Sequence, residues 1–232
     1  MGTLPDPVII QYDNILVVRD DLLPGGTKRR AIPVLFDTEH DEYVYAGPVY
    51  GHAQIALAYA AHDAGKQATI FCAKRSVRHQ CTIEAEQVGA QIFEVEYGRL
   101  SVVQARARSY CCDVPTAKLL PFGLDDPIFI AALAQVARAL LITPSEVWCA
   151  CGSGVLIRAL QQAWPDANCY GVRVGALPLT GPICGLFRAT EKFEQAARFP
   201  PPFPSVENYD SKCWRFIKQH AKSGALFWNV AA

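Results

Sequence analysis

Three stretches of this sequence carry residues whose types and spacing could do chemistry. Lys28 follows two glycines in "RDDLLPGGTKRRAIPVLF", residues 19–36. A Gly-Ser-Gly turn at 152–154 separates an apolar run from an amphipathic one in "VWCACGSGVLIRAL". Asp210 stands in "NYDSKCWRF". An amine, a set of backbone N–H donors and a carboxylate are groups that could bind a small anionic ligand and act on it.

Lys28, at the start of a predicted helix, can be interpreted in several ways. It could contact a phosphate or a nucleic acid, or it could attach a cofactor covalently through its amine. It could also be a solvated charge beside Arg29 and Arg30. Gly25 and Gly26 tolerate backbone conformations that other residues avoid, so they would let the chain turn close to a ligand.

The Gly-Ser-Gly turn at 152–154 predicts either a phosphate-binding loop or a simple tight turn. Unpaired N–H groups at a helix start lie at the positive end of its dipole and can hold an anion. No Gly-Lys-Ser/Thr follows, so the turn is not a Walker A loop. Ile157 occupies the place of the third glycine of a dinucleotide fingerprint and is too large for it. A phosphate therefore fits the turn better than a dinucleotide does.

Alternating helices and strands must position these groups. Apolar residues at helical spacing, glycines at helix ends and short apolar runs directly after them are typical of a parallel sheet with crossover helices. We predict helices at 51–65, 81–90, 126–141, 155–165 and 211–222, and strands at 14–21, 67–73, 91–97, 145–151 and 168–175. Asp125 or Asp126 is the predicted N-cap of the 126–141 helix. The predicted fold class is α/β.

Composition limits the classes of protein that fit. The 232 residues include 22 Lys and Arg and 22 Asp and Glu, so the formal net charge is zero. A neutral chain argues against broad electrostatic attachment to nucleic acid or membrane. No apolar segment reaches the ~18–20 residues that span a bilayer, and we expect a cytoplasmic protein without membrane contact. The nine cysteines show no metal-ligand spacing, so we expect mostly buried, reduced thiols and no metal site.

Four segments, taken in order, resemble the tryptophan-synthase-β-like group of pyridoxal 5'-phosphate (PLP) enzymes, known as fold type II. The similarity is greatest to the branch of D-cysteine desulfhydrase and aminocyclopropane-carboxylate deaminase. "VVRDDLLPGGTKRRA" resembles the strand, Arg-Asp-Asp and Gly-Gly-Asn-Lys of that branch, which carries the Schiff-base lysine. "GHAQIALAYAAHDAGKQATIF" resembles the helix and strand that flank the cofactor, and "VWCACGSGVLIRAL" resembles the phosphate loop. "NYDSKCWRF" resembles the C-terminal segment that faces the pyridine nitrogen.

The resemblance implies a role for each matching residue. Lys28 would form the internal aldimine with the cofactor aldehyde and later serve as general base or acid. Asp210 would keep the pyridine nitrogen protonated and so favour a carbanion at the substrate Cα. The alternative is that Asp210 only caps the last helix. The phosphate would be held by the turn and the N–H groups after it: Gly152, Ser153, Gly154, Val155 and Leu156.

The cofactor-flanking helix departs from the family pattern in its first residues. The family's asparagine, which contacts the phenolic oxygen of the cofactor, is replaced by His52 without a gap, or by Gly51 with a one-residue gap. His52 could donate a hydrogen bond to that oxygen, or it could be satisfied locally at the helix start. Tyr50, Gly51 and His52 are the candidate substrate contacts, although Tyr50 could equally be a core residue. The phosphate loop also lacks the usual third glycine and threonine.

The resemblance also implies two open parallel-sheet α/β subdomains with the cofactor between them. We expect residues 1–46 and 118–232 to form a larger PLP-binding domain and residues 47–117 a smaller one. The chain is shorter than typical members, and we expect the loss in the small domain and near the C-terminus. A homodimer is expected from the family and from the frequency of symmetric dimers.

The leading hypothesis is a PLP-dependent lyase that forms an aldimine with an amino-acid amine and breaks a bond at Cα, by decarboxylation or by elimination or deamination. Short members resemble phage enzymes that process amino acids attached to thymine during DNA hypermodification, in the host cytoplasm. The substrate could thus be free or linked to a nucleobase. Five basic residues are candidate DNA contacts: Lys74, Arg75, Arg78, Arg106 and Arg108. The alternatives are a catalytically inactive PLP-fold binding module and a nucleotide-binding α/β protein without PLP.

Overall fold

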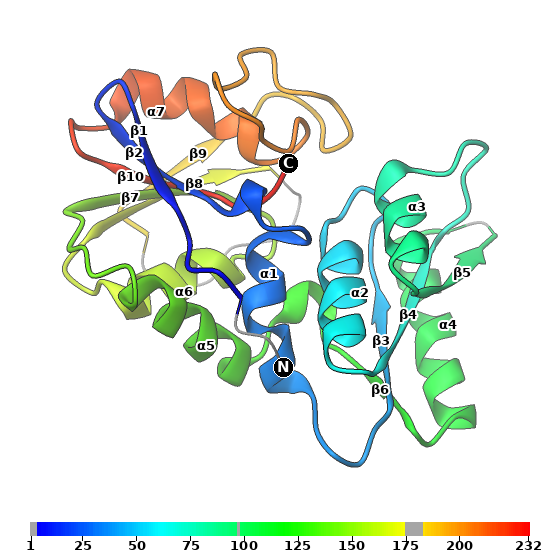
Figure 1. The fold of residues 1–232 in the computed structure, drawn as a ribbon. Coiled ribbons are helices and arrows are strands. Elements are labelled where there is room, and N and C mark those ends of the chain that lie inside the picture. Colours follow the sequence, from blue (N-terminus) through cyan, green and yellow to red (C-terminus); the bar gives the residue numbers. More distant parts are fainter. Residues whose placement is uncertain (1–3, 97, 175–182) are drawn as a thin grey trace. The chain divides into compact units, whose positions relative to one another are not determined.

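A computed structural model describes residues 4–96, 98–174 and 183–232 (Figure 1). The chain divides into two compact units. Unit 1 contains Leu4 and Lys28–Phe129, and unit 2 contains Pro5–Thr27 and Ile130–Ala232. Tyr97 and Gly175, the expected ends of two strands, lie outside the described residues. Within the described ranges, no helix combines the length and the apolarity needed to cross a membrane.

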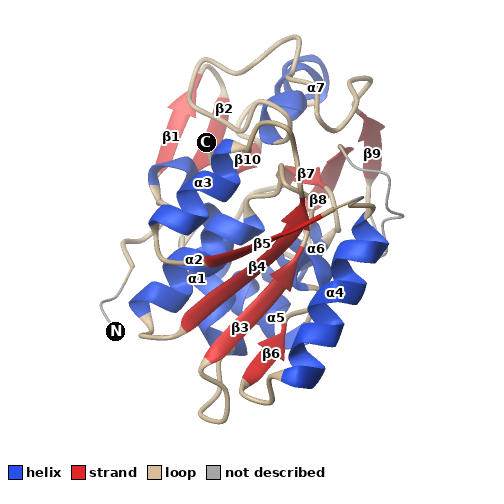
Figure 2. Ribbon diagram, turned by 90° about the vertical axis from the view of Figure 1, so that its right-hand side faces the viewer, coloured by secondary structure: helices blue, strands red, loops and turns tan. Residues whose placement is uncertain are grey.

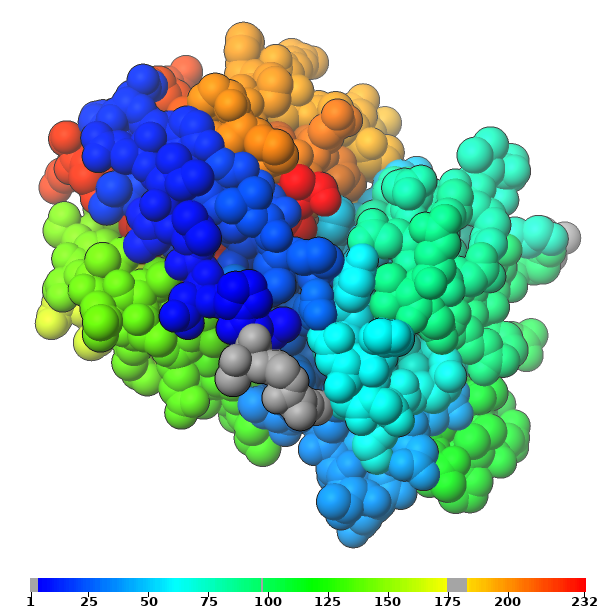
Figure 3. Space-filling model, viewed as in Figure 1, coloured from blue at the N-terminus to red at the C-terminus, as the bar shows by residue number. Residues whose placement is uncertain are grey.

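Unit 2 is built on a six-stranded sheet in the order β1-β2-β10-β7-β8-β9. The strands are β1 (Ile9–Tyr12), β2 (Ile15–Arg19), β10 (Leu226–Asn229), β7 (Glu146–Cys151), β8 (Asn168–Arg173) and β9 (Gly185–Arg188). Only the β1–β2 pair is antiparallel. The C-terminal ends of the parallel strands therefore lie along one edge, where open α/β sheets bind ligands. Figure 3 shows the N-terminal segment of this unit (blue) packed against its C-terminal segments (orange and red).

Helices cover both faces of the unit 2 sheet (Figure 1). One face carries α6 (Val155–Ala163) and α5 (Pro127–Arg138), a helix that begins in unit 1. The other face carries α7 (Trp214–His220), which follows the 3₁₀ turn η4 (Asp210–Cys213). Aromatic side chains fill the core under α7: Trp148, Phe203, Trp214 and Phe227. The Asp126 carboxylate accepts the Ile128 N–H at 2.8 Å, which confirms the predicted cap of α5.

Unit 1 is built on a four-stranded parallel sheet in the order β5-β4-β3-β6. The strands are β3 (Glu42–Ala46), β4 (Gln67–Ala73), β5 (Gln91–Val95) and β6 (Ala117–Leu119). Figure 2 shows α4 (Leu100–Asp113) on one face and α2 (Ala53–Asp63) with α3 (Gln80–Gln87) on the other. Under α4 the rings of Phe71 and Phe93 stack with centroids 4.8 Å apart. The remaining elements are α1 (Gly26–Ala31), η1 (Asp20–Leu22), η2 (Ile32–Leu35) and η3 (Phe122–Leu124).

Strand pairing corrects the expected domain boundaries. The sequence placed residues up to 46 and from 118 onward in the larger domain. The structure instead puts β3 inside the four-stranded sheet, paired with β4 on one side and β6 on the other. A strand bonded on both sides to one sheet cannot belong to another, so the smaller unit extends beyond 47–117 at both ends.

Candidate functional site

Lys28 lies in α1, directly after a residue that is fixed within unit 2. The Thr27 N–H donates to the Val230 carbonyl at 2.9 Å, and its hydroxyl donates to the buried Asp20 carboxylate at 2.7 Å. The Trp228 indole N–H donates to the same Thr27 hydroxyl at 2.9 Å. The first turn of α1 is therefore anchored by bonds to the segment that ends β10 and to the end of β2, and Lys28 follows this anchored residue in the chain.

Gly26 is required by the close approach of two backbones. It has a φ of +66°, and a Cβ added there would overlap the Val230 carbonyl oxygen. Only glycine combines this conformation with so little space. Gly26 thus allows the helix start to meet the segment after β10. The predicted close approach of this turn to a ligand stays a prediction.

The Gly-Ser-Gly turn connects β7 to α6 at the C-terminal edge of the unit 2 sheet. Gly154 is the N-cap of α6 and has a left-handed φ of +80°. The first N–H groups of α6, including those of Val155 and Leu156, have no acceptor within the helix. The turn thus presents backbone donors and the positive end of the helix dipole.

Gly152 differs in one respect from the expectation for the phosphate loop. Its N–H donates to the Tyr209 hydroxyl at 2.9 Å. A Cβ at this position would lie 3.0 Å from the same oxygen, so the glycine makes room for the tyrosine. Tyr209 therefore occupies the first donor of the turn.

Asp210 is fully buried at the start of η4. Its Oδ2 atom accepts the Val230 N–H at 3.3 Å. Burial, with the Asp210 carboxylate beside it, raises the pKa of Tyr209 well above its usual value. The Tyr209 hydroxyl therefore stays neutral, so it accepts the hydrogen bond from Gly152 and keeps its own O–H as a hydrogen-bond donor.

These hydrogen bonds join three of the four segments that carried the resemblance. Gly152 is bonded to Tyr209, and the adjacent Asp210 is bonded to Val230. Val230 in turn accepts the N–H of Thr27, the residue before Lys28. The loop, the carboxylate segment and the start of the lysine segment are thus held together within unit 2.

The fourth segment lies in unit 1, together with Lys28. His52 precedes α2, and its carbonyl accepts the Ala56 N–H at 3.0 Å. Burial, followed by the positive charges of Lys28 and His79, lowers the pKa of His52 to about 4. The imidazole is therefore neutral at physiological pH, and Lys28 is close enough to influence it.

Tyr50 and Gly51 belong to a short loop that is fixed by contacts with neighbouring residues of unit 1. The Tyr50 ring meets His79 edge-on, with centroids 4.8 Å apart. The Gly51 N–H donates to the Pro48 carbonyl at 2.9 Å. The buried Gln54 amide donates to the Val49 carbonyl at 2.8 Å and so fixes the loop onto α2. Tyr50 and Gly51 are only partly buried, as a ligand contact requires.

The candidate DNA contacts lie in unit 1, and two of the five are already engaged. Lys74 is ion-paired with Glu96. Arg78 pairs with Glu86 at 2.7 Å and with Glu94 at 3.6 Å. These acids reduce the local positive charge. The other three residues are exposed: Arg75, Arg106 and Arg108.

Tyr209 is the residue that sequence reasoning missed. It precedes Asp210, yet its partner Gly152 lies 57 positions away. No local pattern connects the two, because the contact depends on how η4 packs against the end of β7. The signal that could have pointed to a polar role is a general one: a buried tyrosine needs a partner for its hydroxyl.

Taken unit by unit, the residues fit the groups of PLP. The turn offers backbone donors to a phosphate, Lys28 offers an amine to an aldehyde, and Asp210 offers a carboxylate to a ring nitrogen. In the described part of unit 2, three further side-chain atoms are buried without a hydrogen-bond partner: Ser205 Oγ, Asn208 Nδ2 and Asn229 Oδ1. Buried polar atoms of this kind usually pair with a water molecule or a ligand.

Comparison with known proteins agrees at the level of the fold. No protein-family model matches the sequence, and no curated protein sequence matches it. Solved structures do match. The chain superposes on an ACC deaminase homologue with a TM-score of 0.84 and 12% identity, over 99% of this chain and 90% of the other.

Two further structures show the same similarity. A threonine deaminase from T.th. gives a TM-score of 0.67 at 14% identity, over 94% of this chain and 86% of the other. Diaminopropionate ammonia lyase of Escherichia coli gives 0.67 at 14% identity, over 100% and 84%. The chain therefore has the tryptophan-synthase-β-like α/β fold of the fold type II PLP enzymes, as the resemblance implied.

Proposed function

We propose that this protein is a PLP-dependent enzyme that acts on an amino-acid amine and breaks a bond at its Cα. The observation that supports it best is a series of three hydrogen bonds that brings the three unit 2 segments together. Gly152 is bonded to Tyr209, Asp210 to Val230, and Val230 to Thr27. When bound, PLP would supply an electron-withdrawing ring that stabilises negative charge at the substrate Cα.

Lys28 would attach the cofactor and move the proton at Cα. The bonds of Thr27 to Val230 and Asp20 restrict the start of α1, so the lysine amine begins from a fixed backbone. The same amine is a suitable general base once the substrate amine has replaced it.

Asp210 and the turn would hold the two ends of the cofactor. The buried Asp210 carboxylate would keep the ring nitrogen protonated, which strengthens electron withdrawal. The N–H groups of Ser153, Gly154 and Val155 would hold the phosphate. The Tyr209 hydroxyl, held by Gly152, connects the loop to the carboxylate segment.

His52 would contact the phenolic oxygen as a neutral donor. With its pKa lowered to about 4, the imidazole carries one N–H and no charge at pH 7. A neutral donor polarises an oxygen less than a cation does, so the phenolic oxygen would keep more of its negative charge.

We further propose decarboxylation or elimination as the reaction, on an amino acid that is free or carried by a thymine base of phage DNA. The ion pairs of Lys74 and Arg78 do not favour DNA contact through unit 1. Release of CO2, ammonia and keto acid from a panel of free amino acids and aminoacylated thymidine distinguishes these reactions and substrates. Efficient turnover of free D-cysteine or serine with none of aminoacylated thymidine would reject the phage DNA role.

The decisive test of the proposal is a covalent adduct at Lys28. The purified chain is incubated with PLP, reduced with borohydride, digested and analysed by mass spectrometry. We expect one pyridoxyl group on the peptide that contains Lys28. Lys28→Ala should lose it, and Asp210→Asn should retain it while losing turnover.

Lys212 provides a matched control. It is a buried lysine of unit 2 whose amine is held by two backbone carbonyls, so it should remain unmodified. Modification spread over surface lysines, or none at all, would reject PLP and favour a nucleotide-binding protein. An adduct at Lys28 without turnover of any amine would favour an inactive binding module.

A further inference from the structure

Two arginines lie in register beside the Gly-Ser-Gly turn. Cys151, the last residue of β7, pairs with Arg173, the last residue of β8. Arg173 in turn pairs with Arg188, the last residue of β9. Neighbouring strands are about 4.8 Å apart, so the two arginines stand about 5 and 10 Å along the sheet edge from the start of the turn.

Both arginines face the side of the sheet that α6 covers. A Cβ added at Gly171 would lie 2.7 Å from Cys151 Sγ, 3.2 Å from Ile157 Cδ1 of α6 and 3.4 Å from Leu186 Cδ1. Side chains two positions apart on a strand share a face, so Arg173 follows Gly171 and Arg188 follows Leu186. The guanidinium groups and the first turn of α6 therefore lie on the same face and at the same edge of unit 2.

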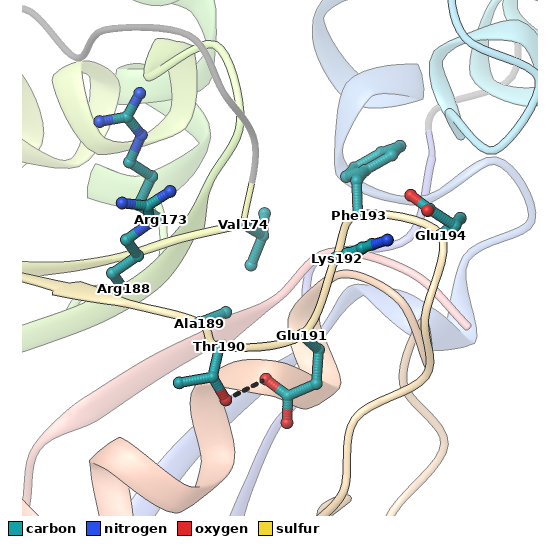
Figure 4. Close-up of a pocket in the computed structure, with 9 residues that line it drawn as sticks. All are labelled: Arg173, Val174, Arg188, Ala189, Thr190, Glu191, Lys192, Phe193 and Glu194. Atoms are coloured by element: carbon teal, nitrogen blue, oxygen red, sulfur yellow. Dashed lines mark hydrogen bonds between the residues drawn. The ribbon is translucent and has the colours of Figure 1, made fainter.

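A cavity of about 620 Å³ opens at these strand ends. Its lining comes from unit 2 alone: Arg173, Val174, Arg188, Ala189, Thr190, Glu191, Lys192, Phe193 and Glu194. In Figure 4 the two arginine side chains project together on one side, and Thr190 and Glu191 point away from them. A volume of several hundred Å³ is typical of small-molecule sites.

The acidic residues of the cavity lie away from the arginine pair. Glu191 lies 3.7 Å from Arg215 and accepts the Arg198 N–H at 3.4 Å. Figure 4 shows Glu194 on the opposite side of the cavity from the arginines. The cavity therefore has a positive end.

The cavity wall opposite the arginines is held in place by the buried Lys212. Lys212 is 2% exposed, and its ammonium donates to the Lys192 carbonyl at 2.7 Å and to the Phe193 carbonyl at 3.3 Å. A buried ammonium bonded to two carbonyls restrains the 192–193 backbone. The part of the cavity wall that carries Lys192 and Phe193 is therefore held in a fixed position.

Arginine side chains that follow each other on neighbouring strands bring two positive charges to one place, and both attract a bound anion. One guanidinium group can saturate both oxygens of a carboxylate. A phosphate ester has further oxygens, so it can accept from two guanidinium groups at once. The paired arrangement of Arg173 and Arg188 therefore matches a phosphate better than a carboxylate.

We propose that Arg173 and Arg188 form a second anion subsite, distinct from the phosphate loop, that binds a phosphate ester carried by the substrate. The substrate role rests on the proposed PLP function, whereas the binding of a phosphate ester does not. An amino acid carried on a nucleotide would offer groups to both sites, whereas a free amino acid has no phosphate to offer the arginines.

The test is equilibrium binding of thymidine 5'-monophosphate, measured by calorimetry on the full chain with and without saturating PLP. We expect the nucleotide to bind and thymidine to bind at least about tenfold more weakly, since it lacks the charge-assisted hydrogen bonds. Arg173→Gln and Arg188→Gln should each weaken binding about tenfold. The exposed Arg198→Gln is the matched control and should change nothing.

Three outcomes would overturn the proposal. Displacement of the nucleotide by PLP would mean that the arginines only extend the cofactor's phosphate site. Equal, arginine-dependent binding of glutamate would make the subsite one for carboxylates. Binding that is insensitive to both arginine variants would place the nucleotide elsewhere. Lys28→Ala should leave nucleotide binding intact. The PLP proposal is tested by a different measurement, the adduct at Lys28, so the two proposals can fail independently.

Discussion

His52 is the residue whose chemistry depends most on its surroundings. Its side chain is largely removed from water and lies near two other basic groups, Lys28 and His79. Both effects favour the neutral imidazole, so the pKa falls to about 4 from the ordinary 6.5.

The depressed pKa of His52 predicts a pH-dependent stability. Between 6.5 and about 4, the unfolded chain binds a proton at His52 that the folded chain does not. The free energy of unfolding therefore decreases as the pH falls through this window. The protein has its full stability, as far as His52 is concerned, only above pH 6.5. At pH 5 the loss should be about 1–2 kcal/mol relative to pH 8.

Urea denaturation of the native sequence and of His52→Asn at pH 8 and pH 5 measures this effect. The variant should show a smaller fall in its midpoint. His62→Asn, an exposed histidine on the same helix, is the control and should behave as the native protein does. Equal pH dependence in all three proteins would contradict the assignment.

Among the elements, α1 begins at a glycine that leaves little space for a larger side chain. Gly26→Ala should destabilise the protein by about 2–4 kcal/mol, because a left-handed alanine is strained and its Cβ meets the Val230 carbonyl. Gly224→Ala has a similar φ of +80° with no atom within 4 Å, so it should cost only about 1 kcal/mol. Midpoints of guanidinium denaturation followed by far-UV circular dichroism give the difference. Equal costs would show that the contact with Val230 is not close.

Elements with a clear local pattern could be predicted, and those that depend on distant partners could not. The strand at 67–73 and the helix after the Gly-Ser-Gly turn are confirmed, since an apolar run and a helical spacing mark them. β10 was missed because its partners β2 and β7 lie far away in the sequence. α4 was missed because it buries little beyond Val103 and Ala107, so its pattern is mainly polar.

The candidate site divides in the same way. Lys28, the turn at 152–154 and Asp210 were proposed from the sequence because each stands in a recognisable segment. The bonds from Tyr209 to Gly152 and from Asp210 to Val230 join parts of the chain that share no local pattern. Arg173 and Arg188 are ordinary strand ends in the sequence, and only the register of β8 and β9 makes them neighbours.

At the scale of the whole molecule, the nine cysteines predict a simple pattern of reactivity. All are free thiols, and only Cys112 and Cys184 are exposed. Burial raises the pKa of the Cys213 thiol well above its usual value, and buried thiols react slowly. We expect native protein to show two rapidly titrating thiols, identified by mass spectrometry after alkylation.

The double variant Cys112→Ser/Cys184→Ser should lose this rapid phase. After denaturation, the protein of unchanged sequence should show all nine thiols reacting. A third fast thiol would indicate local opening of a unit. Cys111 is the first place to look, since it is only partly buried.

The chain passes from one unit to the other inside helices. Unit 2 ends at Thr27 and resumes at Ile130, within α1 and α5. Lys28 is the first residue after one crossing, which explains why a lysine of unit 1 follows directly on bonds made in unit 2.

The aromatic core of unit 2 gives the protein a built-in spectroscopic label. All four tryptophans, at 148, 164, 214 and 228, belong to that unit, and none belongs to unit 1. Excitation of indole alone therefore reports on the sheet that carries the turn, Tyr209 and Asp210. Circular dichroism reports on the helices of both units. Unfolding can thus be followed by indole fluorescence and by circular dichroism in the same denaturation experiment. The difference between the two unfolding midpoints measures how strongly the unfolding of one unit is coupled to that of the other.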